Sequence, residues 1–598
     1  MMKKTGPAET AACHAGRDGI QVKSFCNPLN LEYKFQHFKA DYPAHREAAD
    51  PTLVCYGGRY YLFASMSGGF WHSDNLADWQ FCENATDMYL YAPDVAEVNG
   101  SLVFSASRMS GPSSIWRSKN PLDDDFEKIS APFAFWDPHT FCDEDGRVYF
   151  YWGCSSWAPI YGLEMNPETM MPLGKKQGMF KDRPGLCGWE RTAAYRSPPK
   201  TLSGKLVAKL LGDAPFVEGA YMTKYKGRYY LQYAAPGTEM LPYGDGVYVA
   251  DKPLGPYTVQ AHNPFSTKPG GFITGAGHGS TLRDKQGNWW HASTMRISVN
   301  AKFERRIGLF PAGFDEDGIL FCNQNFADYP YVLPEGSFDP FSVGPQWMLL
   351  SYQKQAEASS SKEGKGPALG VNESISDWWC AAAQQPGEWY RLDLGRVYDV
   401  WAIQLNFADD ALPKLPVSPA QMGGESGQTR YIDMDKGLRT RYLLEGSADG
   451  ESWFVLADKT EAETNLCHDY LLFENGMQLR YVKVTGYEFP YGAAMAISGL
   501  RVFGNGDGSL PGKARATAQR LAGGMDAHIR WEAPPEAQGC NVRYGIAPGK
   551  LYSSWLVYGA QELALPFLDA EQPAYYVCVD AFNESGITPG DVIEVAGA

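Results

Sequence analysis

Three carboxylates begin three similar segments in the first half of the chain: Asp50, Asp137 and Glu218. Carboxyl groups that meet in space can divide acid–base work, because an ionised one takes a proton from water while a protonated one gives its proton to a leaving oxygen. The donor must keep its proton near neutral pH, and burial or a neighbouring negative charge raises its pKa enough for that. A third carboxylate can supply the charge. The three residues therefore predict a site for acid–base catalysis.

The segments that carry these acids belong to a pattern that occurs five times, each time as a strand, a Gly turn and an aromatic strand. The copies span residues 49–62, 92–104, 136–150, 217–231 and 277–290. A four-stranded unit repeated at roughly 40 to 80 residues is typical of a β-propeller, whose innermost strands line a central channel. The pattern predicts an all-β fold that begins with a five-bladed propeller. Residues at one repeat position then converge, which brings the three acids together.

The chain is acidic and rich in aromatic residues. It has 598 residues, and its 53 Lys and Arg against 69 Asp and Glu give a net charge of −16. No basic cluster interrupts this balance, which argues against a nucleic-acid partner and against an anionic membrane surface. Aromatic residues make up 14% of the chain, and 17 of them are Trp. This content suits strand-rich domains and flat sugar-binding surfaces alike.

The N-terminus predicts a cytoplasmic protein. Lys3 and Lys4 are followed by Thr5–Thr10, where a secretory signal would need an apolar run, and we expect no membrane span. A chain from which a signal had been removed would look the same, and that protein would be secreted. The 12 Cys are scattered without metal-ligand spacing, so we expect buried free thiols.

Two further β-sandwich domains are expected after the propeller. The predicted division is a lead-in over 1–44, the propeller over 45–335, a sandwich over 345–505 and a smaller sandwich over 513–598. The alternating strands of the second domain resemble a discoidin (coagulation factor type C) domain, and those of the last resemble a fibronectin type III domain. Carbohydrate binding and structural support are both open for the discoidin-like domain, and its insertion at Pro413–Gln428 could serve or block a binding site.

Four motifs occur in a fixed order along the propeller: Ala49-Asp50-Pro51, Trp136-Asp137-Pro138, Glu218-Gly219 and Gly277-His278-Gly279-Ser280. Together they resemble glycoside hydrolase family 43 over about residues 45 to 333. The resemblance implies an inverting reaction in which Asp50 is the general base and Glu218 the general acid. It also implies that Asp137 tunes the acid and orients the substrate.

The resemblance also implies roles for two other residues. Many members hold a calcium ion at the propeller centre through a His that matches His278, although the chemistry requires no cofactor. His278 lies between two Gly, so a structural hydrogen-bonded role and a place in an ion shell are both open. An Arg ahead of the closing strand contacts substrate in the family, and Arg306 matches it best.

Further substrate contacts are expected from residues near these motifs. Trp136, next to Asp137, is the expected stacking platform. Asp94 occupies the corresponding place in the second copy, where a substrate contact and an ordinary turn residue are both open. Glu190 is a rival to Glu218 as the acid, although we favour an ion pair or a loop contact for it. Other platform candidates, in a fold where most Trp pack between blades, are Trp71, Trp157 and Trp189.

The sequence thus predicts an exo-acting inverting glycosidase that releases a terminal pentose or furanose from a glycan. The family resemblance supplies the candidates α-L-arabinofuranose and β-D-xylose, with β-D-galactofuranose as the alternative. A second hypothesis, from another class, is a non-catalytic carbohydrate-binding protein. The presence of all three acids argues against it.

Overall fold

The computed structural model describes residues 22–37, 43–84, 90–108, 111–192, 201, 214–297, 299–412 and 431–597. Strands dominate this part of the chain, and its helical elements are short 3-10 turns, namely η1 (Pro121–Asp123), η2 (Gly188–Glu190), η3 (Pro367–Val371) and η4 (Pro490–Gly492). No helix among the described residues is long and apolar enough to cross a membrane. The predicted all-β class is confirmed.

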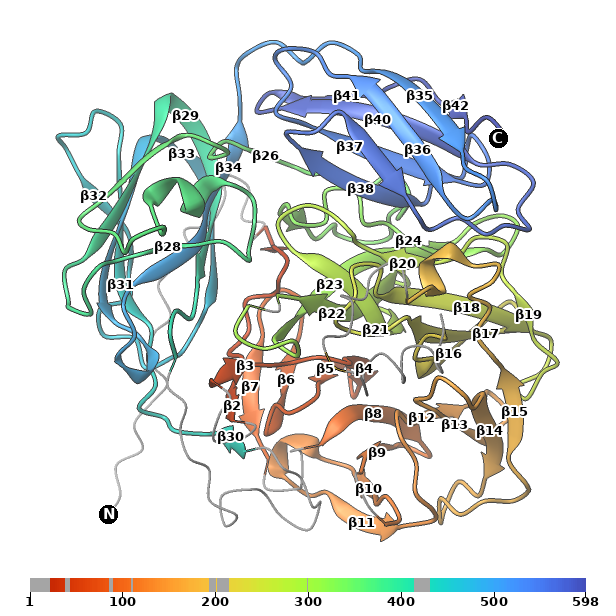
Figure 1. The fold of residues 1–598 in the computed structure, drawn as a ribbon. Coiled ribbons are helices and arrows are strands. Elements are labelled where there is room, and N and C mark those ends of the chain that lie inside the picture. The colour runs from red at the N-terminus through yellow and green to blue at the C-terminus, as the bar shows by residue number, and fades with distance from the viewer. Residues whose placement is uncertain are drawn as a thin grey trace, which may run out of the picture.

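The first three blades of the propeller are antiparallel four-stranded sheets (Figure 1). Blade 1 consists of β4 (Thr52–Tyr56), β5 (Arg59–Phe63), β6 (Gly69–Ser73) and β7 (Gln80–Glu83). Blade 2 consists of β8 (Tyr91–Val98), β9 (Ser101–Ser107), β10 (Ile115–Ser118) and β11 (Glu127–Ser130). Blade 3 consists of β12 (His139–Cys142), β13 (Val148–Trp152), β14 (Ile160–Met165) and β15 (Gln177–Phe180).

Two more blades complete the ring. Blade 4 consists of β16 (Glu218–Tyr225), β17 (Arg228–Ala235), β18 (Gly244–Ala250) and β19 (Thr258–Val259), with β20 (Ser266–Thr267) added beside β18. Blade 5 consists of β21 (Thr274–Arg283), β22 (Trp289–Arg296), β23 (Arg305–Phe314) and β24 (Leu320–Cys322). Each inner strand contacts the inner strand of the next blade, and β21 contacts β4, so the ring is closed. The predicted five-bladed propeller is confirmed.

Aromatic side chains of the second strands pack the blades together. Phe63 of β5 stacks on Phe70 of β6, with ring centroids 4.7 Å apart, and it meets Phe104 of blade 2 at 5.9 Å. Rings of this size remove a large apolar area from water when they fill the space between two sheets. The aromatic strand that recurs in the sequence therefore supplies the core between blades.

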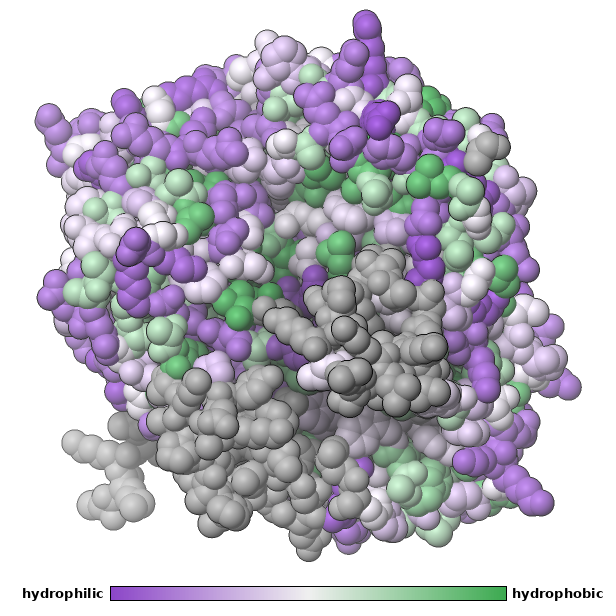
Figure 2. Space-filling model, in the orientation of Figure 1, coloured by the Kyte–Doolittle hydropathy of each residue, from purple (hydrophilic) through white to green (hydrophobic). Residues whose placement is uncertain are grey.

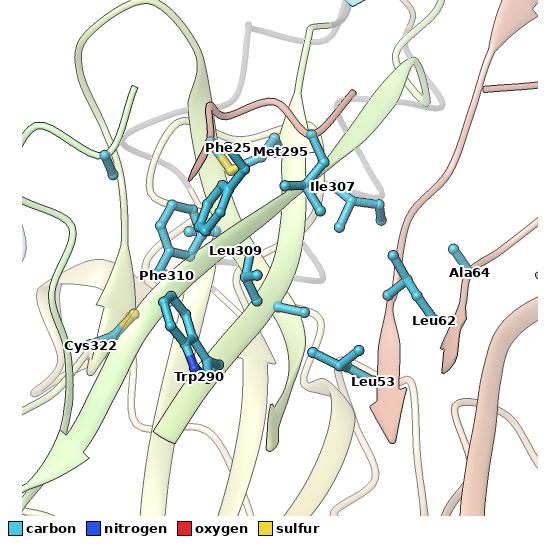
Figure 3. Close-up of a cluster of buried hydrophobic side chains, with 14 of the residues drawn as sticks. Phe25, Leu53, Leu62, Ala64, Trp290, Met295, Ile307, Leu309, Phe310 and Cys322 are labelled. Atoms are coloured by element: carbon cyan, nitrogen blue, oxygen red, sulfur yellow. The ribbon is translucent and has the colours of Figure 1, made fainter. Parts of the chain in front are cut away.

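The segment before the propeller is part of the fold, contrary to the expected lead-in. β1 (Ser24–Phe25) pairs with β25 (Tyr331–Val332), and β2 (Phe35–His37) pairs with both β3 (His45–Arg46) and β30 (Tyr431–Asp433). Phe25 joins the buried cluster of blades 1 and 5, close to Met295 and Ile307 (Figure 3). These strands lack a repeat, so periodicity could not reveal them. Residues 1–21 lie outside the described part of the chain.

A second unit lies beside the propeller (Figure 1). Its eight-stranded sheet contains β26 (Met348–Leu349), β27 (Gln355–Ala358), β28 (Trp379–Cys380), β29 (Trp389–Phe407), β31 (Arg441–Ser447), β32 (Phe454–Asp458), β33 (His468–Glu488) and β34 (Ala496–Asn505). Buried ion pairs and hydrogen bonds join this unit to the propeller. Arg501, for example, which pairs with Glu373 of its own unit at 2.9 Å, donates to the backbone oxygen of Asp328 of the propeller at 2.6 Å.

A third unit, of two smaller sheets, covers another side of the propeller. One sheet contains β35 (Arg515–Arg520), β36 (Ala527–Glu532) and β39 (Glu562–Leu565), and the other contains β37 (Gly539–Gly545), β38 (Ser553–Tyr558), β40 (Tyr576–Asn583), β41 (Gly586–Thr588) and β42 (Ile593–Glu594). Lys550 of this unit pairs with Asp315 of the propeller at 2.6 Å. On the face shown in Figure 2, hydrophilic residues cover most of the described surface, and hydrophobic ones form small groups.

Candidate active site

Each blade has a residue in the left-handed region of backbone conformation, either just before its inner strand or in the first half of that strand. The φ values are 52° at Asp50, 45° at Ala92, 50° at Asp137, 63° at Gly219 and 49° at His278. The neighbouring blade holds this bend. The backbone N–H of Asp50 donates to Thr294 Oγ1 at 2.8 Å, and that of Asp137 donates to Ser107 Oγ at 2.8 Å. A left-handed non-Gly residue costs of order 1–3 kcal/mol, and such residues are frequent at functional sites.

Asp50 is a buried carboxylate surrounded by hydrogen-bond donors. Ser65 Oγ donates to its Oδ2 at 2.6 Å, and Arg305 Nη1 donates to its Oδ1 at 3.2 Å. His278 Nδ1 lies 3.4 Å from the same Oδ1. Burial alone would raise the pKa of Asp50, but Arg305 and His278 outweigh it and hold that pKa below its ordinary value. Asp50 is therefore ionised at neutral pH, as a general base must be.

Asp137 and Glu218 form a close pair of carboxyl groups. An oxygen of one lies within 4.8 Å of an oxygen of the other. Burial raises the pKa of Asp137 to about 8, with the negative charges of Glu218 and Asp50 adding to the effect. Burial and Asp50 also raise the pKa of Glu218. Ionising both would place two like charges side by side, so the pair keeps one proton at neutral pH. That proton is what a general acid requires.

Two donors hold the carboxyl group of Glu218. The hydroxyl of Tyr243 donates to Oε1 at 2.8 Å, and the thiol of Cys154 donates to Oε2 at 3.2 Å. Tyr243 comes directly before β18 of the same blade, whereas Cys154 follows β13 of blade 3. Glu218 is thus oriented from two neighbouring blades.

His278 lies between the two sides of the site. Its Nδ1 is 3.4 Å from Asp50 and 3.9 Å from Asp137, and the negative charges of Asp50, Asp137 and Glu218 raise its pKa against the effect of burial. The imidazole ring lies against Gly219, where an added Cβ would come within 2.7 Å of it. Gly219 also has a positive φ, so a side chain there would be strained and would push His278 away.

The structure corrects the predicted substrate arginine. Arg306 is buried on the far side of its strand, where its Nε donates to His468 of the second unit at 2.9 Å. Arg305 instead reaches Asp50, while its other nitrogens pair with the buried Glu47. Successive residues of β23 point to opposite faces of the sheet, so a choice off by one residue selects the wrong face.

The prediction for Asp94 is also corrected, because its carboxylate makes hydrogen bonds within the protein interior. It is 1% exposed, accepts the backbone N–H of Thr140 at 2.7 Å, and lies 2.9 Å from His139 Nδ1. The residue of blade 2 that matches Asp50 and Asp137 in backbone conformation is Ala92. Asp94 thus lies two positions farther along its strand, and it joins blade 2 to blade 3 instead of facing substrate.

Two of the predicted stacking residues are core residues. Trp71 is 1% exposed and packs on Phe81, with ring centroids 5.3 Å apart. Trp189 is 1% exposed and packs on Tyr233, with ring centroids 5.5 Å apart. Neither can stack on a sugar. Trp136 is half-buried beside Asp137 and Trp157 is 65% exposed, so a stacking role for either stays a prediction.

The rival acid Glu190 is a buried structural residue, as the favoured loop contact implies. Its carboxylate accepts a hydrogen bond from the hydroxyl of Tyr233 and another from the backbone N–H of Arg183. The expected ion pair with Arg191 is absent among the described contacts, because Arg191 binds Asp526 of the third unit. Glu190 thus holds its loop to blade 4, while Arg191 helps to attach the third unit to the propeller.

The residues around His278 do not fit a protein-bound calcium ion. Calcium takes six to eight oxygen ligands. Within the described part of the chain, the cluster of ligand-capable groups is Asp137, Cys154 and Glu218, and His278 is outside it. A thiol and an imidazole nitrogen are poor partners for so hard a cation. The imidazole Nδ1 is directed at carboxylates, as in a structural hydrogen-bonded role.

Sequence reasoning missed five residues whose side chains contact the carboxyl groups of the acids: Ser65, Ser107, Cys154, Tyr243 and Arg305. The adjacent pair Arg305 and Arg306 was a visible signal, and strand alternation explains why one of the two faces Asp50. Ser65, Ser107, Cys154 and Tyr243 lie outside the repeated motifs, so the pattern gave no signal for them.

Comparison with protein families finds a match in the propeller. Residues 44–320 match the model of Glycosyl hydrolases family 43. Among solved structures, a chain described as a glycoside hydrolase aligns with 76% of this chain and 97% of its own length, at 17% identity and a TM-score of 0.43. A thermostable family-43 glycoside hydrolase aligns with 50% of this chain and 95% of its own length, at 23% identity and a TM-score of 0.39.

Curated relatives match less than half of the chain. A beta-xylosidase of Xylanibacter ruminicola is 26% identical over 183 residues, which are 29% of this chain and 56% of the relative. A xylosidase/arabinosidase 43A of Humicola insolens is 27% identical over 253 residues, which are 38% of this chain and 73% of the relative. The chain spans about half the length of the first curated relatives that it matches, at 56% and 46%.

Proposed function

We propose that this protein, whose residues 44–320 match the family 43 model, is an inverting exo-glycosidase that releases a terminal pentose or furanose. One observation carries the proposal. Asp50 lies 3.2 Å from Arg305 and has a lowered pKa, whereas Asp137 and Glu218 lie within 4.8 Å of each other and have raised pKa values. A site with a ready base and a ready acid is what glycoside hydrolysis requires.

In the proposed mechanism, Asp50 takes a proton from a water molecule as that water attacks the anomeric carbon. Glu218 gives its proton to the glycosidic oxygen as the bond to the leaving group breaks. Asp137, within 4.8 Å of Glu218, disfavours loss of that proton before substrate arrives. Arg305 keeps Asp50 ionised, because its guanidinium group lies 3.2 Å from the carboxylate.

The names of two relatives support the choice of sugar. They are a beta-xylosidase and a xylosidase/arabinosidase, and both sugars are pentoses. A β-D-xyloside or an α-L-arabinofuranoside is therefore the proposed substrate, and a β-D-galactofuranoside is the alternative. The glycan itself is the proposed partner.

A panel of nitrophenyl pentosides and furanosides tests the proposal. We expect hydrolysis of the β-D-xyloside, the α-L-arabinofuranoside or both, and we expect NMR to show that the sugar is first released with inverted anomeric configuration. The Asp50→Asn variant is the control for contaminating activity. Hydrolysis of the β-D-galactofuranoside alone would select the alternative. Binding of xylo- or arabino-oligosaccharides with no hydrolysis of any glycoside would favour a carbohydrate-binding protein.

A further inference from the structure

Cys154 lies beside the proposed acid, although the sequence pattern gave it no place in the site. It follows β13 in a short loop that is tied down on both sides. The backbone N–H of Gly153 donates to the oxygen of Trp136 at 2.9 Å, and Ser155 and Val217 exchange two backbone hydrogen bonds of 3.2 Å each. Trp136 precedes Asp137 and Val217 precedes Glu218, so the loop fixes Cys154 between the two acids.

The thiol of Cys154 acts as a hydrogen-bond donor to Glu218. Its Sγ lies 3.2 Å from Oε2, and it is also within 4.8 Å of a carboxylate oxygen of Asp137. Burial and the negative charges of Asp137 and Glu218 raise the pKa of Cys154 well above its ordinary value. The group therefore remains a thiol and not a thiolate.

The chemistry of this contact differs from that of a hydroxyl. An S–H group is a weak donor, whereas an O–H group that binds a carboxylate makes a short and strong bond. Any donor to Oε2 favours the ionised carboxylate, and a stronger one favours it more. Tyr243 already supplies one hydroxyl to Oε1. A second strong donor would lower the pKa of Glu218, so that the residue would lose its proton more easily.

We propose that Cys154 is a positioning residue for Glu218. The thiol of Cys154 fixes the orientation of the Glu218 carboxyl group while giving it only a weak hydrogen bond. This inference rests on the proposed role of Glu218 as the acid. It goes beyond that role because it explains why a cysteine, and not a serine, lies at this point. Orientation matters because the proton must point at the glycosidic oxygen.

Two substitutions separate orientation from bond strength. Cys154→Ser supplies a stronger hydrogen-bond donor, which stabilises the ionised form of Glu218. The upper, high-pH limb of the pH profile of kcat/KM therefore moves to lower pH by roughly half a unit. Cys154→Ala removes the donor, so that limb stays or moves up, while kcat on an alkyl glycoside falls about 10-fold. A nitrophenyl glycoside needs little protonation and should lose less.

A second thiol of blade 3 provides the matched control. Cys142 is half-buried on β12 and contacts the backbone oxygen of Asp143 at 3.9 Å, not a site residue. Cys142→Ser and Cys142→Ala should retain the wild-type pH profile and leaving-group dependence. Thermal unfolding of all four variants checks that they fold, and the leaving-group dependence of Cys154→Ala decides the matter if Cys154→Ser does not fold.

The outcomes distinguish this inference from the proposed function. A wild-type protein that hydrolyses no glycoside would overturn both. An active wild-type protein whose two Cys154 variants behave like the Cys142 variants would overturn the positioning role alone. A shift of the upper limb in the same direction for Cys154→Ser and Cys154→Ala would also overturn it, because donor strength would then not explain the effect.

Discussion

The two sides of the site, with Asp50 buried and Glu218 half-buried, treat the charge of their carboxyl groups in opposite ways. Asp50, at the start of blade 1, receives Arg305 and Ser65, and its pKa is lowered. Glu218, at the start of blade 4, receives the neutral donors Tyr243 and Cys154, and its pKa is raised. Burial alone disfavours charge on both sides. The difference teaches that a positive charge from blade 5, with Arg305 as its main source, favours the ionised form of one carboxyl group over the other.

The most damaging test of this comparison is Asp50→Asn. An amide cannot take the proton of the attacking water, so we expect kcat to fall by about 10²–10⁴-fold on every substrate, whatever its leaving group. Steady-state kinetics on a nitrophenyl glycoside and on an unactivated disaccharide measure this. Near-normal rates on both would remove Asp50 from the role of base.

The opposite side is tested by Glu218→Gln. Loss of the acid should reduce the hydrolysis of an unactivated disaccharide by about 10²–10⁴-fold, and that of a nitrophenyl glycoside much less, because the phenolate leaves without a proton. The ratio of the two rates is the measurement. Equal losses on both substrates would show that Glu218 is not the acid.

Arg305→Gln should raise the pKa of Asp50, so that both Asp50 and Glu218 would have pKa values raised by burial. Without the guanidinium group, burial raises the pKa of Asp50, so the lower limb of the kcat/KM profile moves to higher pH, and each unit of that shift corresponds to about 1.4 kcal/mol. The matched control is Arg305→Lys, which keeps the positive charge and should leave the limb closer to its wild-type position. An unmoved limb in Arg305→Gln would show that Arg305 does not set the ionisation of Asp50.

Asp137→Asn sharpens the comparison from the other side. In the wild-type protein, the upper limb reports loss of the one proton shared by Asp137 and Glu218, since burial raises the pKa of Asp137 to about 8. With an amide at 137, Glu218 no longer has that negative neighbour, so its pKa falls and the upper limb moves to lower pH. The lower limb, set by Asp50, should stay nearly still. Movement of the lower limb alone would couple Asp137 to the base instead.

The smallest effect on catalysis is expected for Asp94→Asn. Asp94 binds Thr140 and His139 within the fold, so its loss should lower the free energy of unfolding by about 1–3 kcal/mol. kcat and KM should change little, because Asp94 does not reach the acids. Thermal unfolding and steady-state kinetics separate the two effects. A large fall in kcat with unchanged stability would restore Asp94 as a substrate contact.

The sequence by itself determined the repeat and the acids. Five copies of one pattern required five similar sheets, and closing those sheets into a ring brought the starts of blades 1, 3 and 4 together. Asp50 and Asp137 were therefore readable from position in the repeat, and Glu218 lies one residue before the matching position, Gly219. That reasoning works because an inner strand has the same place in every blade.

Only the tertiary structure decided which other side chains join the acids. Arg305 and Arg306 are adjacent residues of the same type, but strand alternation directs Arg305 to Asp50 and Arg306 to His468 of the second unit. Cys154 and Tyr243 meet Glu218 from two different blades. A pattern within one blade cannot specify contacts between blades, because these depend on how the folded sheets pack.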